Sequence, residues 1–260
     1  MRENTLKATL AQGKAVFGVM ITFPSAPVVE MLGCLGFDWV LIDNEHGSIT
    51  VDNSEDMVRA AELSGIAPIV RPVANKPEII APFLDRGAWG VQVPHVNTAD
   101  EARAAVDAVK YYPEGHRGIF SRGRPAGYGF SGSTGDYVAD ANRNSLVCLM
   151  LEEVEAIQNL ESMVQVDGVD VFFIGSGDLS QSMGVPGQQT RPEVQAMMER
   201  GVDLIVKSGK VAGVSCPDNL VPKFLDLGVQ YFHGNVNSLL QTSSVAYLDS
   251  MRESAVKAGL

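Results

Sequence analysis

The chain has 260 residues, of which 45% are hydrophobic and 20% are charged, a balance typical of a globular protein with a sizeable core. Its formal net charge of −11 offers no basic surface to a phosphate backbone, so we expect no nucleic-acid partner. No run of residues approaches the roughly 20 apolar positions of a membrane span, and the segment 1–14 lacks the apolar stretch of a secretory leader. Together with three widely spaced cysteines that show no metal-binding spacing, these features predict a cytoplasmic protein without a membrane partner.

Along the chain, short apolar runs alternate with segments that have helical patterning. The first helix is expected over 2–12, and the next over 24–36, where a proline stands in the first turn and Gly36 stands at the end. Thr98 and Glu101 have the spacing of a capping box at the start of another helix. The predicted strands are 16–21, 38–43, 67–71, 90–95, 146–152, 170–174, 211–216 and 229–235. The remaining predicted helices are 51–64, 77–86, 98–111, 153–160, 191–208, 217–227 and 235–257.

This alternation of strand and helix, repeated eight times, is the sequence pattern of a (β/α)8 TIM barrel. A chain of this length suits one such barrel, so we predict a single domain over residues 1–260. In this fold the carboxyl ends of all eight strands meet at one mouth, although the strands are far apart in sequence. The polar residues that the pattern brings to this mouth are Asp43, Glu45, His46, Arg71, His95, Glu152, Asp178 and Asn235.

The segment 113–145 interrupts the rhythm and is rich in glycine, serine and arginine. Loops longer than about 15 residues are uncommon in compact domains unless they are functional or mobile. We expect this segment to lie over the barrel mouth, with a helical turn over 138–144. The alternative is an insertion without a functional role.

Glu152 and Asp178 are the first pair of candidate ligands. Both carboxylates follow buried strands, where an unpaired charge is costly. A divalent cation would compensate both, and hard oxygen ligands favour Mg²⁺ or Mn²⁺. Two alternatives stay open: Glu152 can pair with an arginine at the mouth, and Asp178 can cap the helical turn that begins after it.

Three further features point to catalysis at the same end. Arg71 ends a strand and could stabilise a developing oxyanion, or it could simply pair with Asp43 or Glu45. His46 is a candidate general base, because histidine changes charge near neutral pH, although a structural role is equally open. The turn 175–177, Gly-Ser-Gly, exposes backbone N–H groups that attract carboxylates or phosphates, but a tight strand-to-helix turn also needs glycine.

Six stretches in this order resemble the HpcH/HpaI aldolase family of metal-dependent pyruvate aldolases. They are FDWVLIDNEHG (37–47), IVRP (69–72), LDRGA (84–88), YPEGHRG (112–118), LEEVEA (151–156) and FIGSGDLS (173–180). The resemblance extends from about Phe17 to Leu240. It implies a barrel of the phosphoenolpyruvate/pyruvate-binding type.

The resemblance also implies roles for individual residues. Glu152 and Asp178 match the carboxylates that bind Mg²⁺, Mn²⁺ or Co²⁺. Arg71 matches the arginine that contacts the keto oxygen, His46 the histidine that handles protons through a water, and Asp85 its acidic partner. The backbone N–H groups of Gly177 and Asp178 match those that hold the pyruvate carboxylate. Family members exchange their last helix, here 235–257, between subunits and commonly form homohexamers that are trimers of dimers.

Two departures from the family pattern bear on the substrate. Met150 stands where the family often has Gln, and Ser176-Gly177 stands where it usually has Pro-Ala. Arg122, Arg124 and Ser215 lie where the family selects the aldehyde, and the two arginines suggest an acidic aldehyde. Ser176, Ser215 and Arg122 are therefore predicted substrate contacts.

The reaction predicted from these features is the reversible cleavage of a 4-hydroxy-2-oxo acid, such as a 2-keto-3-deoxy acid, to pyruvate and an aldehyde. The enolate formed in this cleavage would be stabilised by the metal and by Arg71. One alternative is a coenzyme A thioester lyase of the citryl-CoA or malyl-CoA type. Another is a non-catalytic protein that binds keto acids or metal ions.

Overall fold

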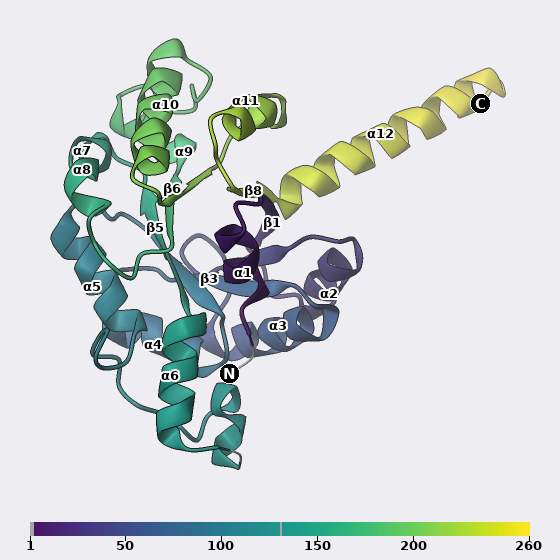
Figure 1. Ribbon diagram of the computed structural model, residues 1–260. Coiled ribbons are helices and arrows are strands. Elements are labelled where there is room, and N and C mark those ends of the chain that lie inside the picture. Colours follow the sequence, from purple (N-terminus) through teal and green to yellow (C-terminus); the bar gives the residue numbers. More distant parts are fainter. Residues whose placement is uncertain (1–2, 131) are drawn as a thin grey trace.

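The protein folds into a closed barrel of eight parallel strands, whose order around the barrel is the order along the chain (Figure 1). The computed structural model describes residues 3–130 and 132–260, so Arg2 of the predicted first helix lies outside the described residues. The predicted (β/α)8 fold is confirmed. The strands are β1 Val16–Ile21, β2 Trp39–Asp43, β3 Ala67–Arg71, β4 Gly90–Val93, β5 Leu146–Leu151, β6 Val171–Ile174, β7 Val211–Val214 and β8 Tyr231–Asn235.

Helices cover the outside of the barrel, and their ends carry the expected local signals. Thr98 caps α5 through a capping box with Glu101. Gly65, at φ 83°, supplies the left-handed residue that ends α3. The helices are α1 Thr5–Ala11, α2 Ala26–Cys34, α3 Val51–Ser64, α4 Pro77–Asp85, α5 Ala99–Val109, η1 Arg124–Gly129, α6 Thr134–Asn144, α7 Val154–Gln158, α8 Leu160–Met163, α9 Ser176–Ser182, α10 Pro192–Lys207, η2 Asp218–Leu220, α11 Val221–Asp226 and α12 Val236–Lys257.

The inside of the barrel is a packed core. Trp39 stacks on Tyr231 with ring centroids 4.1 Å apart, and Phe173 meets Tyr231 edge-on at 6.0 Å. All three side chains are fully buried. Because these rings fill the interior, the barrel has no central pore, and in this fold the ligand site lies at the carboxyl ends of the strands.

The segment 113–145 does not lie over the mouth, so this part of the prediction is wrong. It connects α5 to β5, and a helix-to-strand connection returns to the amino-terminal end of the barrel. Arg124 forms an ion pair with Glu62 near the end of α3, and the Asn4 backbone N–H donates to Asn144 Oδ1 at 2.9 Å. The segment also contains more structure than the predicted helical turn, because α6 runs over eleven residues.

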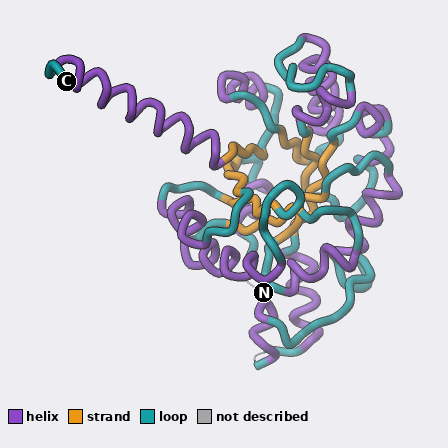
Figure 2. Tube along the Cα trace, turned by 180° about the vertical axis from the view of Figure 1, so that it is seen from behind, coloured by secondary structure: helices purple, strands orange, loops and turns teal. Residues whose placement is uncertain are grey.

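The final helix, α12, leaves the barrel after its first turn and projects away from it (Figures 1 and 2). Val236 is its buried residue, whereas Leu240, Tyr247 and Val256 are exposed. Next to its start, the outer face of β1 and β8 borders a cavity of about 180 Å³, and Phe17 on this face is 43% exposed. Within the described residues, none of the helices combines the length and the apolar character needed to cross a membrane.

Candidate active site

A cavity of about 650 Å³ opens at the carboxyl ends of the strands. It collects residues from β1, β3, β5, β6 and β8, from the segments that follow β2, β5, β6 and β7, and from the beginning of α12. The predicted site residues that line it are His46, Arg71, Glu152, Ser176, Gly177, Asp178 and Ser215. Residues separated by more than a hundred positions therefore face one space, as the barrel pattern requires.

Arg71 is the central cation of this site. It is 6% exposed, and its Nε and Nη2 donate to Asp43 Oδ1 and Oδ2 at 2.8 Å and 2.7 Å. This pairing follows from the strand register, which sets Asp43 on β2 directly beside Arg71 on β3. Burial lowers the pKa of Arg71, but the hydrogen bonds and charge of Asp43 raise it overall, so the guanidinium stays charged.

The side of the guanidinium that faces the cavity is bordered by sulfur. Arg71 Nη1 lies 4.0 Å from Met150 Sδ, and Nη2 lies 3.5 Å from Met20 Sδ. A thioether is a weak acceptor, so Arg71 keeps donor capacity for an oxygen atom in the cavity. Met150, where the family often has Gln, therefore leaves the arginine without a competing amide oxygen.

Glu152 and Asp178 carry the negative charge of the cavity. Glu152 is 1% exposed, and its Oε1 accepts a hydrogen bond from the His95 backbone N–H at 2.8 Å. Burial raises the pKa of Glu152. The hydrogen bond and the charge of His95 lower this pKa, and the charges of Glu45 and Asp178 raise it by smaller amounts, so the pKa is raised overall. A cation between Glu152 and Asp178 would relieve both the burial cost and the repulsion.

The donor set fits a hard divalent cation. Mg²⁺ is commonly held by one or two protein carboxylates, with waters or substrate oxygens at the other positions. Glu152 and Asp178 supply two carboxylates. Across residues 3–130 and 132–260, no group of three or more His, Cys, Asp or Glu side chains is placed to hold a metal ion. The geometry therefore suits an open site rather than a closed protein cage.

The turn between β6 and α9 is fixed by serine hydroxyls. The Ser176 backbone N–H donates to Ser215 Oγ at 3.1 Å, and the two hydroxyl oxygens are 3.3 Å apart. Ser180 Oγ donates to the Gly177 carbonyl at 2.6 Å, which closes the first turn of α9. Ser215 therefore helps to hold the turn that carries Gly177 and Asp178.

The loop after β2 places Glu45 between two histidines. Glu45 Oε2 is 3.2 Å from Arg71 Nε and 3.9 Å from His46 Nε2, and Glu45 Oε1 is 3.4 Å from His95 Nε2. The loop can turn here because Gly47 has no Cβ, which would lie 2.2 Å from the Asp43 carbonyl oxygen. His46 thus reaches the cavity from a loop that is tied to the arginine.

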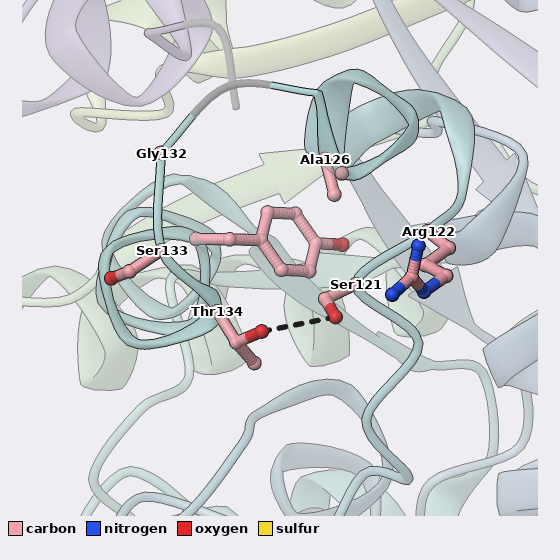
Figure 3. A pocket seen from close by; sticks show the side chains of 8 residues that line it. Ser121, Arg122, Ala126, Gly132, Ser133 and Thr134 are labelled. Carbon is pink, nitrogen blue, oxygen red and sulfur yellow. Dashed lines mark hydrogen bonds between the residues drawn. The ribbon is translucent and has the colours of Figure 1, made fainter.

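Two predicted site residues are not at the mouth of their own chain. Asp85 ends α4, at the opposite end of the barrel, where it accepts from Arg117 Nη2 at 2.6 Å. Arg122 lines a different cavity of about 90 Å³, beside Ser121 and Thr134 at the start of α6 (Figure 3). The physical reason is the direction of the chain, because helix carboxyl ends and helix-to-strand loops lie away from the mouth.

Some residues of the site were not singled out in the sequence. Met20 lines the cavity, and no polar signal marks a methionine in an apolar run. His233 also lines the cavity and stacks on Phe173 with ring centroids 4.8 Å apart. Burial lowers the pKa of His233 to about 4, so its imidazole is neutral at neutral pH. The sequence could have indicated this position, because His233 stands two residues before Asn235 and alternate residues of a strand lie on the same face.

Comparison with known proteins agrees with this site. Residues 18–234 match the family described as HpcH/HpaI aldolase/citrate lyase. The chain is 36% identical to a hydroxypyruvate/pyruvate aldolase of Roseobacter denitrificans, with 88% of this chain and 89% of the relative covered. It is also 36% identical to a 4-hydroxy-2-oxo-heptane-1,7-dioate aldolase of Escherichia coli over 99% of both chains. Among solved structures, the citrate synthase SbnG superposes with a TM-score of 0.85 at 30% identity, covering 96% of this chain and 98% of that one.

The chain belongs to the HpcH/HpaI aldolase/citrate lyase family. The resemblance drawn from the six sequence stretches is therefore confirmed, and so is the prediction of an aldolase-type carbon–carbon lyase.

Proposed function

We propose that this protein is a divalent-metal-dependent aldolase that reversibly cleaves a 4-hydroxy-2-oxo acid to pyruvate and an aldehyde. The observation that carries the proposal is the convergence of Glu152, Asp178 and Arg71 on one cavity at the barrel mouth. Two carboxylates and a guanidinium suit the binding of a 2-oxo acid, whose oxygens and developing enolate are negatively charged. The names of the aldolase relatives support this reaction class.

Each residue takes a part that its position supports. Glu152 and Asp178 would hold the metal ion, which when bound supplies Lewis acidity toward the keto acid. Arg71 donates to the oxygen that gains charge as the C3–C4 bond breaks. His46, through a water, takes the proton of the 4-hydroxyl group. The N–H groups of Gly177 and Asp178 begin α9, where backbone donors lack acceptors within the helix, and they bind the substrate carboxylate.

An imine mechanism finds no support in the cavity. Among the described residues that line it, none is a lysine. The buried Lys110 lies at the other end of the barrel, where its Nζ donates to the carbonyls of Asn142 and Ser145. A Schiff base needs a lysine amine in contact with the keto carbon, so the pyruvate would have to be activated without one.

The test is a panel of aldehydes incubated with pyruvate and with Mg²⁺, Mn²⁺ or Co²⁺, read by product formation. EDTA should abolish the activity, and borohydride with pyruvate should not inactivate the protein. Activity that survives complete metal removal, or inactivation by borohydride, would refute the proposal.

A second candidate function is a coenzyme A thioester lyase or synthase. The observation in its favour is the likeness to the citrate synthase SbnG. An assay with coenzyme A thioesters separates it from the aldolase. A protein that only binds keto acids is separated by exchange of the pyruvate C3 protons in D₂O, since an enzyme exchanges them and a passive binder does not.

The same proposal includes an oligomer, a trimer of dimers in which α12 is exchanged between subunits. Its support is the projection of α12 from the barrel and the partly exposed Phe17 beside the start of this helix (Figures 1 and 2). Asp85 and Arg122 can take the roles that the resemblance implies only at the mouth of another copy. Arg124 is already held by Glu62, which leaves Arg122 and Ser215 as the proposed contacts of an acidic aldehyde. The cytoplasmic location stays a prediction.

Complementation between two inactive variants tests the shared site. Glu152→Ala removes a metal ligand and Asp85→Asn removes the proposed acidic partner of His46. Each homo-oligomer should have little activity, but co-expressed subunits should regain part of it, because some mouths receive an intact set from two chains. Mixed oligomers as inactive as the parents would show that Asp85 does not act across subunits.

A further inference from the structure

His95, two residues after the end of β4, has a backbone conformation that its side chain disfavours. Its φ is 53°, in the left-handed region, and apart from glycines the described chain shows this only here and at Tyr128. A non-glycine residue in this region is strained, because its Cβ approaches the following carbonyl. Such strain persists where the surrounding structure holds it, and it gathers at functional sites.

The consequence of this conformation is that two successive backbone donors reach the same neighbouring strand. The His95 N–H donates to Glu152 Oε1 at 2.8 Å, and the Val96 N–H donates to the Met150 carbonyl at 3.2 Å. In an extended strand, successive N–H groups point to opposite sides. The left-handed residue turns both toward the end of β5, where the first donates to the carboxylate of Glu152 and the second to the carbonyl of Met150.

The two carboxylate oxygens of Glu152 have different surroundings. Oε1 is held by the backbone of His95, whereas Oε2 lies beside the turn at Gly175, where a Cβ would come within 3.2 Å of it. Glu152 lines the mouth cavity, and His95 does not appear among the residues lining it. His95 therefore acts on a ligand in the cavity through the side chains that it contacts, Glu152 and Glu45.

The imidazole joins this carboxylate to the loop after β2. His95 Nδ1 is 3.5 Å from Glu152 Oε1 and 3.3 Å from Glu153 Oε1, and Nε2 is 3.4 Å from Glu45 Oε1. Glu45 in turn contacts Arg71 at 3.2 Å. A continuous chain of polar contacts thus runs from the proposed metal ligand to the arginine.

We propose that His95 is a positioning residue for the metal-binding carboxylate, and that its left-handed backbone is the part that orients Glu152. The inference rests on the proposed function. In this arrangement the N–H of His95, placed by the left-handed backbone, fixes one oxygen of Glu152 and leaves the other to the cation. Groups that orient a metal ligand in this way typically contribute about 10- to 100-fold to metal affinity.

Two substitutions that both remove the imidazole separate the backbone from the side chain. His95→Gly adopts the left-handed region freely and keeps the N–H in place. His95→Val is β-branched and resists that region, so the chain is driven out of it. We expect the Kd for Mn²⁺, measured by electron paramagnetic resonance of the free ion, to stay within about threefold of wild type for His95→Gly. For His95→Val it should rise by about 10-fold or more. His95→Asn, which tolerates the left-handed region, should behave like His95→Gly.

Equal Mn²⁺ affinities for the glycine and valine variants would overturn the proposal. A wild-type protein that binds Mn²⁺ no better than Glu152→Ala would instead refute the metal site itself, so the two failures are distinct.

Hydrogen exchange of the His95 amide gives a metal-independent measurement, should the valine variant not fold. In wild type without metal this amide should exchange at least about 10-fold more slowly than in Glu152→Ala, whereas the Val96 amide should be protected in both. Equal exchange of the His95 amide in the two proteins would show that the N–H does not hold Glu152.

Discussion

Buried charges are compensated differently at the two ends of the barrel. At the amino-terminal end, Arg117 pairs with Asp85, and the Lys110 ammonium is satisfied by two backbone carbonyls. At the mouth, Arg71 already has Asp43 and Glu45 as partners, yet two further carboxylates line the same cavity. These are Glu152, whose charge acts on Arg71, and Asp178, whose charge acts on Glu152.

This difference separates stability from function within one fold. Balanced pairs at the amino-terminal end leave little charge to be compensated, so they serve the folded state. The excess negative charge at the mouth opposes folding of the metal-free protein, and a bound cation is the natural compensation. Substitutions at the mouth should therefore reduce activity without loss of stability, and substitution of Lys110 at the opposite end should do the reverse. Asp85 is the exception at that end, because it is proposed to act at the mouth of another copy.

The largest expected effect is that of Glu152→Gln. Loss of a charged ligand should lower kcat/KM by at least about 10³-fold, since metal assistance is worth several kcal/mol. The metal-free protein should become more stable by roughly 0.5–2 kcal/mol, because an uncompensated buried charge is removed while the amide oxygen still accepts from His95. Enzyme kinetics and urea unfolding in EDTA measure the two quantities.

Glu153→Gln is the matched control for this substitution. Glu153 is the next residue, but its side chain is 38% exposed and is not among the cavity-lining residues. Its kcat/KM should stay within a few-fold of wild type. A Glu152→Gln protein that is both inactive and less stable would break the proposed contrast between the two ends.

Arg71→Lys should have the next largest effect. Lysine keeps the positive charge but cannot donate two parallel hydrogen bonds to Asp43 and still reach the substrate oxygen. Loss of such a preorganised donor typically costs about 10²–10³ in kcat. Arg59→Lys, on the exposed face of α3, controls for the chemical change alone. A kcat within threefold of wild type would remove Arg71 from the reaction.

The comparison of the two ends also shows which parts of the fold and of the site could be predicted from the sequence. The eight strands could be predicted from the regular alternation of apolar runs and helical segments. The residues at the mouth could be predicted from them, because in this fold the carboxyl ends of all strands meet at the same mouth. The position of the segment 113–145 was not predicted correctly, although its place between a helix and the next strand was sufficient to assign it to the opposite end. The left-handed backbone of His95 leaves no mark in residue type, and the Arg71–Asp43 pairing depends on a strand register that the sequence leaves open.

At the amino-terminal end, Lys110→Met should affect stability instead. Lys110 is 2% exposed, and methionine has a similar length but leaves the Asn142 carbonyl without the Lys110 ammonium, while the Ser145 carbonyl keeps the Lys7 ammonium at 3.4 Å. A buried acceptor without a partner costs roughly 1–3 kcal/mol, so the free energy of unfolding should fall by about this amount. The kcat of the folded protein should not change. A Lys110→Met protein with normal stability and reduced kcat would contradict the separation of the two ends.

The smallest expected effect is a pH dependence at the same residue. Burial lowers the pKa of Lys110 from 10.5 to about 8. Between these values the unfolded chain binds a proton that the folded protein has released, so the free energy of unfolding rises with pH. Its contribution is fully present above pH 10.5 and is lost as the pH falls through about 8. From about pH 8 to pH 9.5 the gain should be roughly 1.5 kcal/mol, and Lys110→Met should lack it. Urea unfolding of both proteins at the two pH values measures the difference between them, and parallel pH profiles would show that this lysine is charged throughout.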